Sequence, residues 1–495
     1  MNTRRYVLLF LSFAIASLTA PLARAQAQAS PVPNTSIELR ALSPTPTLLG
    51  DVLRSTAKNF PSVLAARAAI DEKRAESLAA NGVFDPRVDG GVYSRLGGYY
   101  DGSAADVGFY QSIPMLGAEV FADYSLSGGD FPIYEDQLVT TDFGQARVGI
   151  AVSLLRDRDI DDRRFGVAKA ALAEQIAESA LLAEQIGVLQ DAFIAYSRWL
   201  ISAEILTAYE ELLSIAQVRA TALTRQVEAG DVAEIVLVEN EQALLQREGL
   251  VVEAQRQVRL AGERLSLYLR DEDGVVLLPA FDASLSIPEF DESFVNAPEQ
   301  SLVDQALRNR PDIAIANTLK EQFRLERRLA ENLAKPQLDL RVYSARDFGE
   351  GVRRRQGTDA VADIAFSVPL ATRTARGRAA AADARLVAVV HELRLLVDEA
   401  TRDLRLSLVN LRATAQLKDV ALRELQVAQG LAEAEQRQFE AGTSDYFLLN
   451  VRERSLGEAQ LRRWQAELNH QVALANYFAI SMNQEVLWGE VASAQ

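Results

Sequence analysis

The residues that could carry out chemistry are few and scattered along the chain. In 495 residues there are two His, His391 and His470, and no Cys. His391-Glu392 begins like the His-Glu-x-x-His motif of zinc peptidases, but Leu395 stands where the second His is needed. There is no Gly-rich phosphate loop with its Lys-Ser/Thr and no Gly-x-Ser-x-Gly elbow. We therefore expect no enzyme, no metal site and no cofactor.

The charge balance excludes another class of partner. The formal net charge is −16, whereas a phosphate backbone is bound by clustered Lys and Arg. A hydrophobic fraction of 48% argues against a disordered chain. We expect a folded protein that does not bind nucleic acid.

The N-terminus resembles a secretory signal. Arg4 and Arg5 precede a short apolar run at residues 7–18, and Ala23-Arg24-Ala25 fits a small-x-small cleavage site. Beyond residue 25 no run of about 18 apolar residues suggests a transmembrane helix. If the exported chain enters a membrane, it must do so as β-strands.

The chain contains an internal duplication. The hexapeptide at 225–230 matches residues 437–442 at five of six positions, including the final Gly. Matches also join Pro61 to Pro311, Pro86 to Pro336, and Val92-Tyr93-Ser94 to Val342-Tyr343-Ser344. The offset falls from 250 at the prolines to 212 at the glycines, so the first copy holds about 38 extra residues between these points. The shared order of the matches predicts one structural plan used twice.

We expect the following organisation from the duplication. The segments are a signal peptide at 1–25, a first repeat at 26–270, a connector at 271–300, a second repeat at 301–485 and a tail at 486–495. The first repeat would hold strands at about 87–155 and a helical hairpin at about 160–270, with its tip at residue 230. The second would hold strands at about 337–370 and a hairpin at about 374–485, with its tip at residue 442.

Helical periodicity dominates both repeats. Residues 161–229 contain no Pro, and apolar residues recur there at intervals of three and four. Residues 376–441 repeat the pattern, and each segment would be roughly 100 Å long at 1.5 Å per residue. Shorter helices at 48–81 and 301–332 should break at Pro61 and Pro311. Helices of this length must pack side by side as coiled coils.

The predicted strands alternate strictly between apolar and small or charged residues. The pattern is clear at 147–154, 338–344 and 362–368, and it is typical of outer-membrane strands, although a soluble half-buried sheet has the same period. Two strands per repeat would give four per chain and twelve in a trimer. Strand-like runs at 107–112 and 120–126 leave the count open.

In this order and duplication the chain resembles the TolC-like outer-membrane efflux proteins. The residues that carry the resemblance are Asn309-Arg310-Pro311-Asp312, Ser367-Val368-Pro369-Leu370 and Phe439-Glu440-Ala441-Gly442-Thr443-Ser444. The resemblance spans about residues 48–485 and implies a mainly α fold: duplicated long-helix hairpins form a trimeric α-helical barrel continued by a transmembrane β-barrel of twelve strands. It further implies a homotrimer in the lipid of the outer membrane, with a periplasmic tunnel that docks with an adaptor (membrane fusion) protein and an inner-membrane pump.

The resemblance also implies where the tunnel opens. The family narrows its periplasmic entrance beside the second-repeat tip, so we take as entrance or gate candidates Phe439, Glu440, Gly442, Ser444, Asp445, Leu448 and Val451. Leu448 and Val451 stand where family members often carry Asp, which puts an acidic ring at that depth in doubt. Candidates for adaptor docking at the two tips are Arg225, Glu228, Gly230, Asp231, Arg437 and Gly442. Acidic groups at the tips would favour cations, or they are ordinary solvated charges at helix ends.

The function predicted from the sequence is passive export of small molecules or proteins as the exit duct of a tripartite efflux pump or a type I secretion system. A periplasmic coiled-coil scaffold without a pore is the alternative. The sequence does not separate drug efflux from protein secretion.

Overall fold

A computed structural model describes residues 42–43, 45–230, 232–351 and 357–482. The predicted signal peptide, the C-terminal tail and Asp231 lie outside the described residues. The described chain divides into two compact units. One takes residues 71–175 and 318–390, and the other takes residues 42–70, 176–317 and 391–482. Both repeats contribute to each unit.

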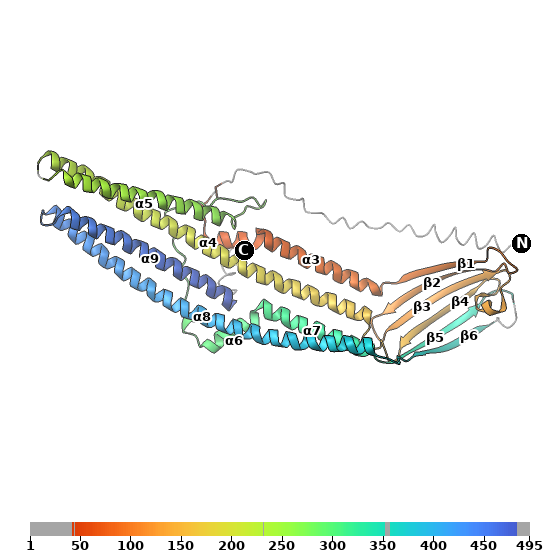
Figure 1. The fold of residues 1–495 in the computed structure, drawn as a ribbon. Helices are drawn as coiled ribbons and strands as arrows, with labels where there is room; N and C mark the ends of the chain where they lie inside the picture. The colour runs from red at the N-terminus through yellow and green to blue at the C-terminus, as the bar shows by residue number, and fades with distance from the viewer. Residues whose placement is uncertain (1–41, 44, 231, 352–356, 483–495) are drawn as a thin grey trace. The chain divides into compact units, whose positions relative to one another are not determined.

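The first unit contains a six-stranded antiparallel sheet in which the strands follow one another in chain order (Figure 1). The strands are β1 Arg87–Ser94, β2 Ser103–Ile113, β3 Ala118–Gly128, β4 Gln145–Ser153, β5 Gln337–Asp347 and β6 Thr358–Ser367. The sheet joins the two repeats through the pairing of β4 with β5, in which Ile150 lies opposite Val342. The apolar and polar alternation predicted from the sequence therefore places each repeat's apolar residues on the same face.

The number of strands differs from the four per chain that a twelve-stranded trimer would need. The first repeat supplies four strands and the second supplies two, so the described chain has six rather than four. The runs at 107–112 and 120–126 lie inside β2 and β3, which pair with each other along eleven residues. They form a complete hairpin because both runs alternate and Pro114 to Gly117 lie between them. The extra 38 residues of the first repeat belong largely to this hairpin and its loops.

The helices of the two repeats match closely in length. The first repeat has α2 Leu49–Asn59, α3 Pro61–Asn81, α4 Asp162–Glu228 and α5 Ile235–Ser266. The second has α6 Glu299–Asn309, α7 Pro311–Asn332, α8 Arg373–Glu440 and α9 Tyr446–Ser481. Pro61 and Pro311 each begin a new helix, which confirms the predicted breaks, because Pro disfavours helical geometry in the residue before it. The two long helices, of 67 and 68 residues, are also confirmed.

Two large apolar clusters hold the second unit together. One packs α2 against α4 and the end of α5, with Leu53, Phe193 and Trp199 almost fully buried. The other packs α6 against α8 and α9 around Tyr477 and Phe478. The connector between the repeats contributes Phe290, Phe294 and several aliphatic residues to these clusters. The connector is therefore a packed part of this unit rather than a loose linker.

None of the helices in the described residues is both long enough and apolar enough to cross a membrane.

Candidate functional site

The two hairpin tips turn on glycines that adopt the left-handed backbone conformation. Gly230 has φ 81° and Gly442 has φ 71°. After α8, the Gly442 N–H bonds to the Phe439 carbonyl at 3.0 Å and the Thr443 N–H bonds to the Gln438 carbonyl at 2.9 Å. This pair of bonds closes a helix C-terminus in the Schellman arrangement, which needs positive φ at its first residue beyond the helix. Gly is favoured at this position because it has no Cβ and adopts positive φ without strain.

The acidic entrance candidates have local structural partners. Asp445 precedes α9 and accepts a hydrogen bond from the Leu448 N–H at 2.8 Å, so it caps the helix N-terminus. Glu440 is exposed and accepts a bond from Gln436 at 2.7 Å. Ser444 donates to Glu435, which is buried. Asp445 can therefore act as a charge at the surface and as a cap at once.

The other candidates divide by exposure. Phe439 is half-buried, whereas Leu448 and Val451 are exposed on α9. The charged docking candidates Arg225, Glu228 and Arg437 are all exposed in the last turn of their helices. Gly230 and Gly442 are exposed beside them. The tips thus present both charged and apolar side chains at the surface of the described chain.

A buried charge cluster that sequence reasoning missed ties the two hairpins together. Arg219 of α4 donates a hydrogen bond to each carboxylate oxygen of Glu453 on α9. The bond from Arg219 Nη1 to Glu453 Oε2 is 2.8 Å long. Arg247 of α5 donates to Glu453 at 2.6 Å and to the Leu212 carbonyl of α4 at 3.0 Å. The Arg219 and Glu453 side chains are only 7% and 8% exposed. We call these three residues the Arg-Glu-Arg cluster.

Two more contacts connect this cluster and its neighbours to all four helices of the hairpins. Arg219 also donates to Gln436 of α8 at 3.2 Å, and Tyr446 of α9 bonds to Asn240 of α5 at 3.0 Å between buried side chains. Burial disfavours the charged form of Glu453, but the hydrogen bonds and charges of the two Arg outweigh it and lower its pKa below the usual carboxyl value. Glu453 is therefore an anion held between two cations.

A signal for this cluster was present in the sequence. Arg219 takes one place in a buried stripe with Leu212, Ala216 and Leu223, and Glu453 interrupts the buried positions of α9 in the same way. A charge at a core-facing position needs a partner of opposite sign, because burying it alone is costly. The partner could not be named from sequence, since it lies on the other repeat.

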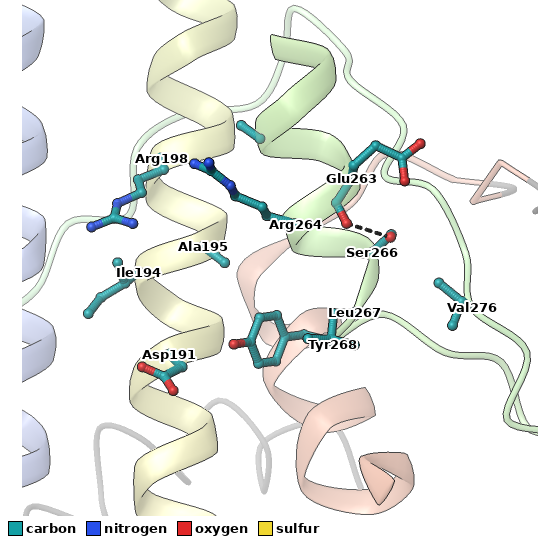
Figure 2. Close-up of a pocket in the computed structure, with 11 residues that line it drawn as sticks. Asp191, Ile194, Ala195, Arg198, Glu263, Arg264, Ser266, Leu267, Tyr268 and Val276 are labelled. Carbon is teal, nitrogen blue, oxygen red and sulfur yellow. Dashed lines mark hydrogen bonds between the residues drawn. The ribbon is translucent and has the colours of Figure 1, made fainter. Parts of the chain in front are cut away.

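An open pocket of about 570 Å³ lies elsewhere in the second unit, between α4, the end of α5 and the start of the connector (Figure 2). The Tyr268 ring lies between the two helices in Figure 2 and stacks on Phe60 at 5.3 Å. Burial raises the Tyr268 pKa, and the nearby Asp191 carboxylate adds to that rise. Arg198 and Arg264 line the pocket from exposed positions. The lining residues suit a seam between helices rather than a reaction centre.

Comparison with known proteins gives a clear result only at the level of structure. No protein-family model matches the sequence, and no curated protein matches it. Among solved structures, the chain is similar to the Campylobacter jejuni CmeC outer membrane channel, with a TM-score of 0.58, 14% identity, and 88% of this chain and 85% of that chain covered.

The outer membrane protein VceC from Vibrio cholerae gives a TM-score of 0.59 at 14% identity, covering 88% of this chain and 96% of that chain. The open state of the Neisseria gonorrhoeae MtrE outer membrane channel gives 0.59 at 14% identity, covering 88% of each chain. The chain has the outer-membrane channel fold. The resemblance in fold predicted from the sequence is confirmed.

The two His of the chain differ in their exposure and contacts. His391 is exposed on α8. His470 is buried on α9, with its ring nitrogens 2.8 Å from a Glu292 oxygen and 3.3 Å from the Thr414 hydroxyl. In the part of the chain that the structure describes, no three His, Cys, Asp or Glu residues gather as metal ligands would. The position of His470 fits the docking of the connector on α9 of the channel fold.

Proposed function

We propose that the chain is one protomer of a homotrimeric outer-membrane exit duct through which small molecules or proteins leave passively. The observation that carries the proposal is a sheet with one charged and one exposed apolar face, in a chain that has the outer-membrane channel fold. In this proposal the sheet enters the outer membrane as part of a barrel. The long helices form the wall of a periplasmic tunnel.

The distribution of charge on the sheet supports a water-filled interior. Eleven of the twelve charged strand residues fall on one face by strand register, and only Arg346 falls on the other. The residues on the charged face are Arg87, Asp89, Asp106, Glu119, Asp123, Arg147, Asp339, Arg341, Asp347, Asp359 and Asp363. A face of this kind belongs in water, as the inner surface of an outer-membrane barrel does.

The opposite face supports contact with lipid. Several of its large apolar side chains are exposed in the described chain, with Val88 at 65%, Ile364 at 62% and Phe366 at 79%. A soluble half-buried sheet would cover such a face with helices. A periplasmic scaffold without a pore, the alternative from the sequence, would leave these side chains in water, so this observation favours the channel.

The hairpin tips are proposed as the periplasmic entrance. Phe439, Leu448 and Val451 would narrow the opening, and the exposed tip charges would meet an adaptor protein, which couples the duct to an inner-membrane pump. The Arg-Glu-Arg cluster would hold the first-repeat hairpin against the second in a closed entrance. Opening by separation of the hairpins would break the bonds of Glu453 to Arg219, because these bonds cross between the repeats.

Conductance across planar bilayers tests the proposal. The purified protein should form ion channels, and Glu453→Ala should raise the open-channel current by loosening the entrance. Phe439→Ala should raise it as well if the ring narrows the opening, whereas Leu78→Ala, an exposed residue of α3, serves as control. Absence of any conductance from folded, membrane-inserted protein would contradict the channel and favour the alternative function, a scaffold without a pore.

A further inference from the structure

We propose that the β2–β3 hairpin is built into the wall of the barrel, so that the trimer closes with eighteen strands, six from each protomer. The inference rests on the proposed trimeric channel. It deepens that function, because the number of strands sets the width of the exit and hence the size of solute that can leave.

The hairpin occupies a place that has no counterpart in the second repeat. There, β5 and β6 pair directly, with Val342 opposite Ala362. Their counterparts in the first repeat are β1 and β4, since Val92 matches Val342 and residues 148–153 align with residues 362–367, with three of the six positions identical. Yet β1 pairs with β2, and β4 pairs with β3. The hairpin has therefore separated two strands that would otherwise be neighbours.

The side chains of the hairpin continue both faces of the sheet. Val107, Val120 and Leu126 share the apolar face, and Asp106, Glu119 and Asp123 share the charged face. The charged face is also joined by contacts between strands. Asp123 of β3 accepts a hydrogen bond from Arg147 of β4 at 2.7 Å, and the Phe121 ring lies 6.2 Å from that of Tyr343 on β5. A hairpin with lipid-facing and lumen-facing residues in register is a wall element rather than a loop.

The hairpin is also fastened at its turn. Leu116 and Gly117 both have positive φ, at 57° and 56°, as the two central residues of a type I′ hairpin turn do. A Cβ on Gly117 would lie 2.5 Å from the Asp157 carbonyl oxygen, so the turn packs closely against the chain that leads into α4. Arg163 of α4 donates to Ser112 at 2.7 Å. The turn is thus held against the start of a helix and cannot swing out freely.

Closure of a barrel permits such an insertion only in pairs of strands. With six strands, β1 and β6 still run in opposite directions, so β1 of one protomer can pair antiparallel with β6 of the next. Every residue of β1 and nearly every residue of β6 is exposed in the single chain, so both edges are open for this pairing. Open edges cannot remain unpaired in lipid. A second and a third copy are therefore the partners that these edges require.

The inserted strands widen the exit. With strands about 4.8 Å apart and tilted by about 40°, eighteen strands give a backbone diameter of about 36 Å, against about 24 Å for twelve. Barrels of 16 to 18 strands leave an aqueous channel. The exit of this protein would pass solutes too wide for a twelve-stranded barrel, such as a partly folded polypeptide, so selection by size would fall on the entrance.

Disulfide cross-linking of the purified trimer tests the strand order, because the native chain has no Cys. Val342→Cys with Ala362→Cys, and Val120→Cys with Ile150→Cys, replace facing neighbours and should both cross-link within a chain under mild oxidation. The matched pair Val92→Cys with Val148→Cys should not cross-link. These two positions stand three strands apart in our account, roughly 14 Å, beyond the reach of a disulfide.

Efficient cross-linking of Val92→Cys with Val148→Cys in intact trimers would overturn the inference, since β1 and β4 would then be neighbours and the barrel would have twelve strands. A count of strands by electron cryomicroscopy of the wild-type trimer gives an independent result: eighteen supports the inference and twelve overturns it. Failure to obtain a membrane-bound trimer at all would instead contradict the proposed function.

Discussion

The two repeats agree in their helices and differ in their strands. α4 and α8 have 67 and 68 residues, α3 and α7 have 21 and 22, and α2 and α6 have 11 each. The strand regions, in contrast, hold four strands in the first repeat and two in the second. In a helical tunnel, the helices of both repeats must span the same distance, so their lengths are constrained together. A sheet can gain a hairpin without changing the direction of its edge strands.

The tips of the two repeats also differ, because the buried charged residues of one repeat have no buried charged counterparts in the other. At the offset of 212 found for the tip glycines, Glu453 corresponds to Glu241 and Arg219 corresponds to Leu431. Glu241 and Leu431 are both exposed, whereas Glu453 and Arg219 are buried. The helices thus reflect the shared plan, while the contacts between hairpins are specific to each repeat.

The largest effect should come from the Arg-Glu-Arg cluster. Glu453→Ala leaves two buried guanidinium groups without their carboxylate and should destabilise the packing of the hairpins by about 3–5 kcal/mol. Its counterpart Glu241→Ala, at an exposed position, should change stability by less than about 0.5 kcal/mol. Thermal unfolding of the trimer and hydrogen exchange in α4 and α9 measure both variants. Equal effects of the two substitutions would show that the cluster is not a tie between repeats.

The tip glycines should show a smaller effect that is shared by both repeats. Gly230→Ala and Gly442→Ala force a Cβ into left-handed backbone conformation, and each should cost about 1–2 kcal/mol. Gly430→Ala, inside α8 with no atom within 4 Å of the added Cβ, should instead stabilise by about 0.5–1 kcal/mol. Chemical unfolding compares the three variants, and stabilisation by either tip substitution would contradict the assigned turns.

The caps of the return helices should differ between repeats by about the same amount or less. Asp445→Ala removes the cap of α9 and should cost about 1 kcal/mol, whereas Asp445→Asn keeps a capping oxygen and should cost little. α5 begins without a side-chain cap, so Glu234→Ala should have almost no effect. Hydrogen exchange at the first turns of α5 and α9 reports the difference. If Asp445→Asn also alters ion selectivity in bilayers, the charge of Asp445 acts at the entrance in addition to its role as a cap.

Mild acid should have the smallest effect on the stability that the Arg-Glu-Arg cluster provides. The pKa of Glu453 in the folded protein is lowered, so its contribution to stability is present above the usual carboxyl pKa of 4.5 and is lost only as the pH falls through the lower folded value. Hydrogen-exchange protection at Glu453 and its neighbours, corrected for intrinsic rates, should therefore stay constant from about pH 7 to about pH 5. Loss of protection in that range would mean that Glu453 is not held as an anion.

The sequence predicted the elements that repeat and missed the contacts that do not. The prolines at 61 and 311, the glycines at 230 and 442 and the helical periodicity located the helices, because each signal acts through local backbone geometry. The β2–β3 hairpin was visible as two alternating runs, but alternation does not say which strands pair. Arg219 and Glu453 are far apart in sequence, and only the packing of one repeat on the other brings them together. Asp445 was identified as a charge, while its role as a cap emerged from its bond to the Leu448 amide.

Fractionation of the expressed full-length chain tests the central claim most directly. We predict that it sediments with the outer membrane on a sucrose gradient. On gel electrophoresis the unboiled sample should run near three times the mass of the processed chain, and boiling should convert this band to the monomer. A soluble periplasmic monomer or dimer would contradict the account.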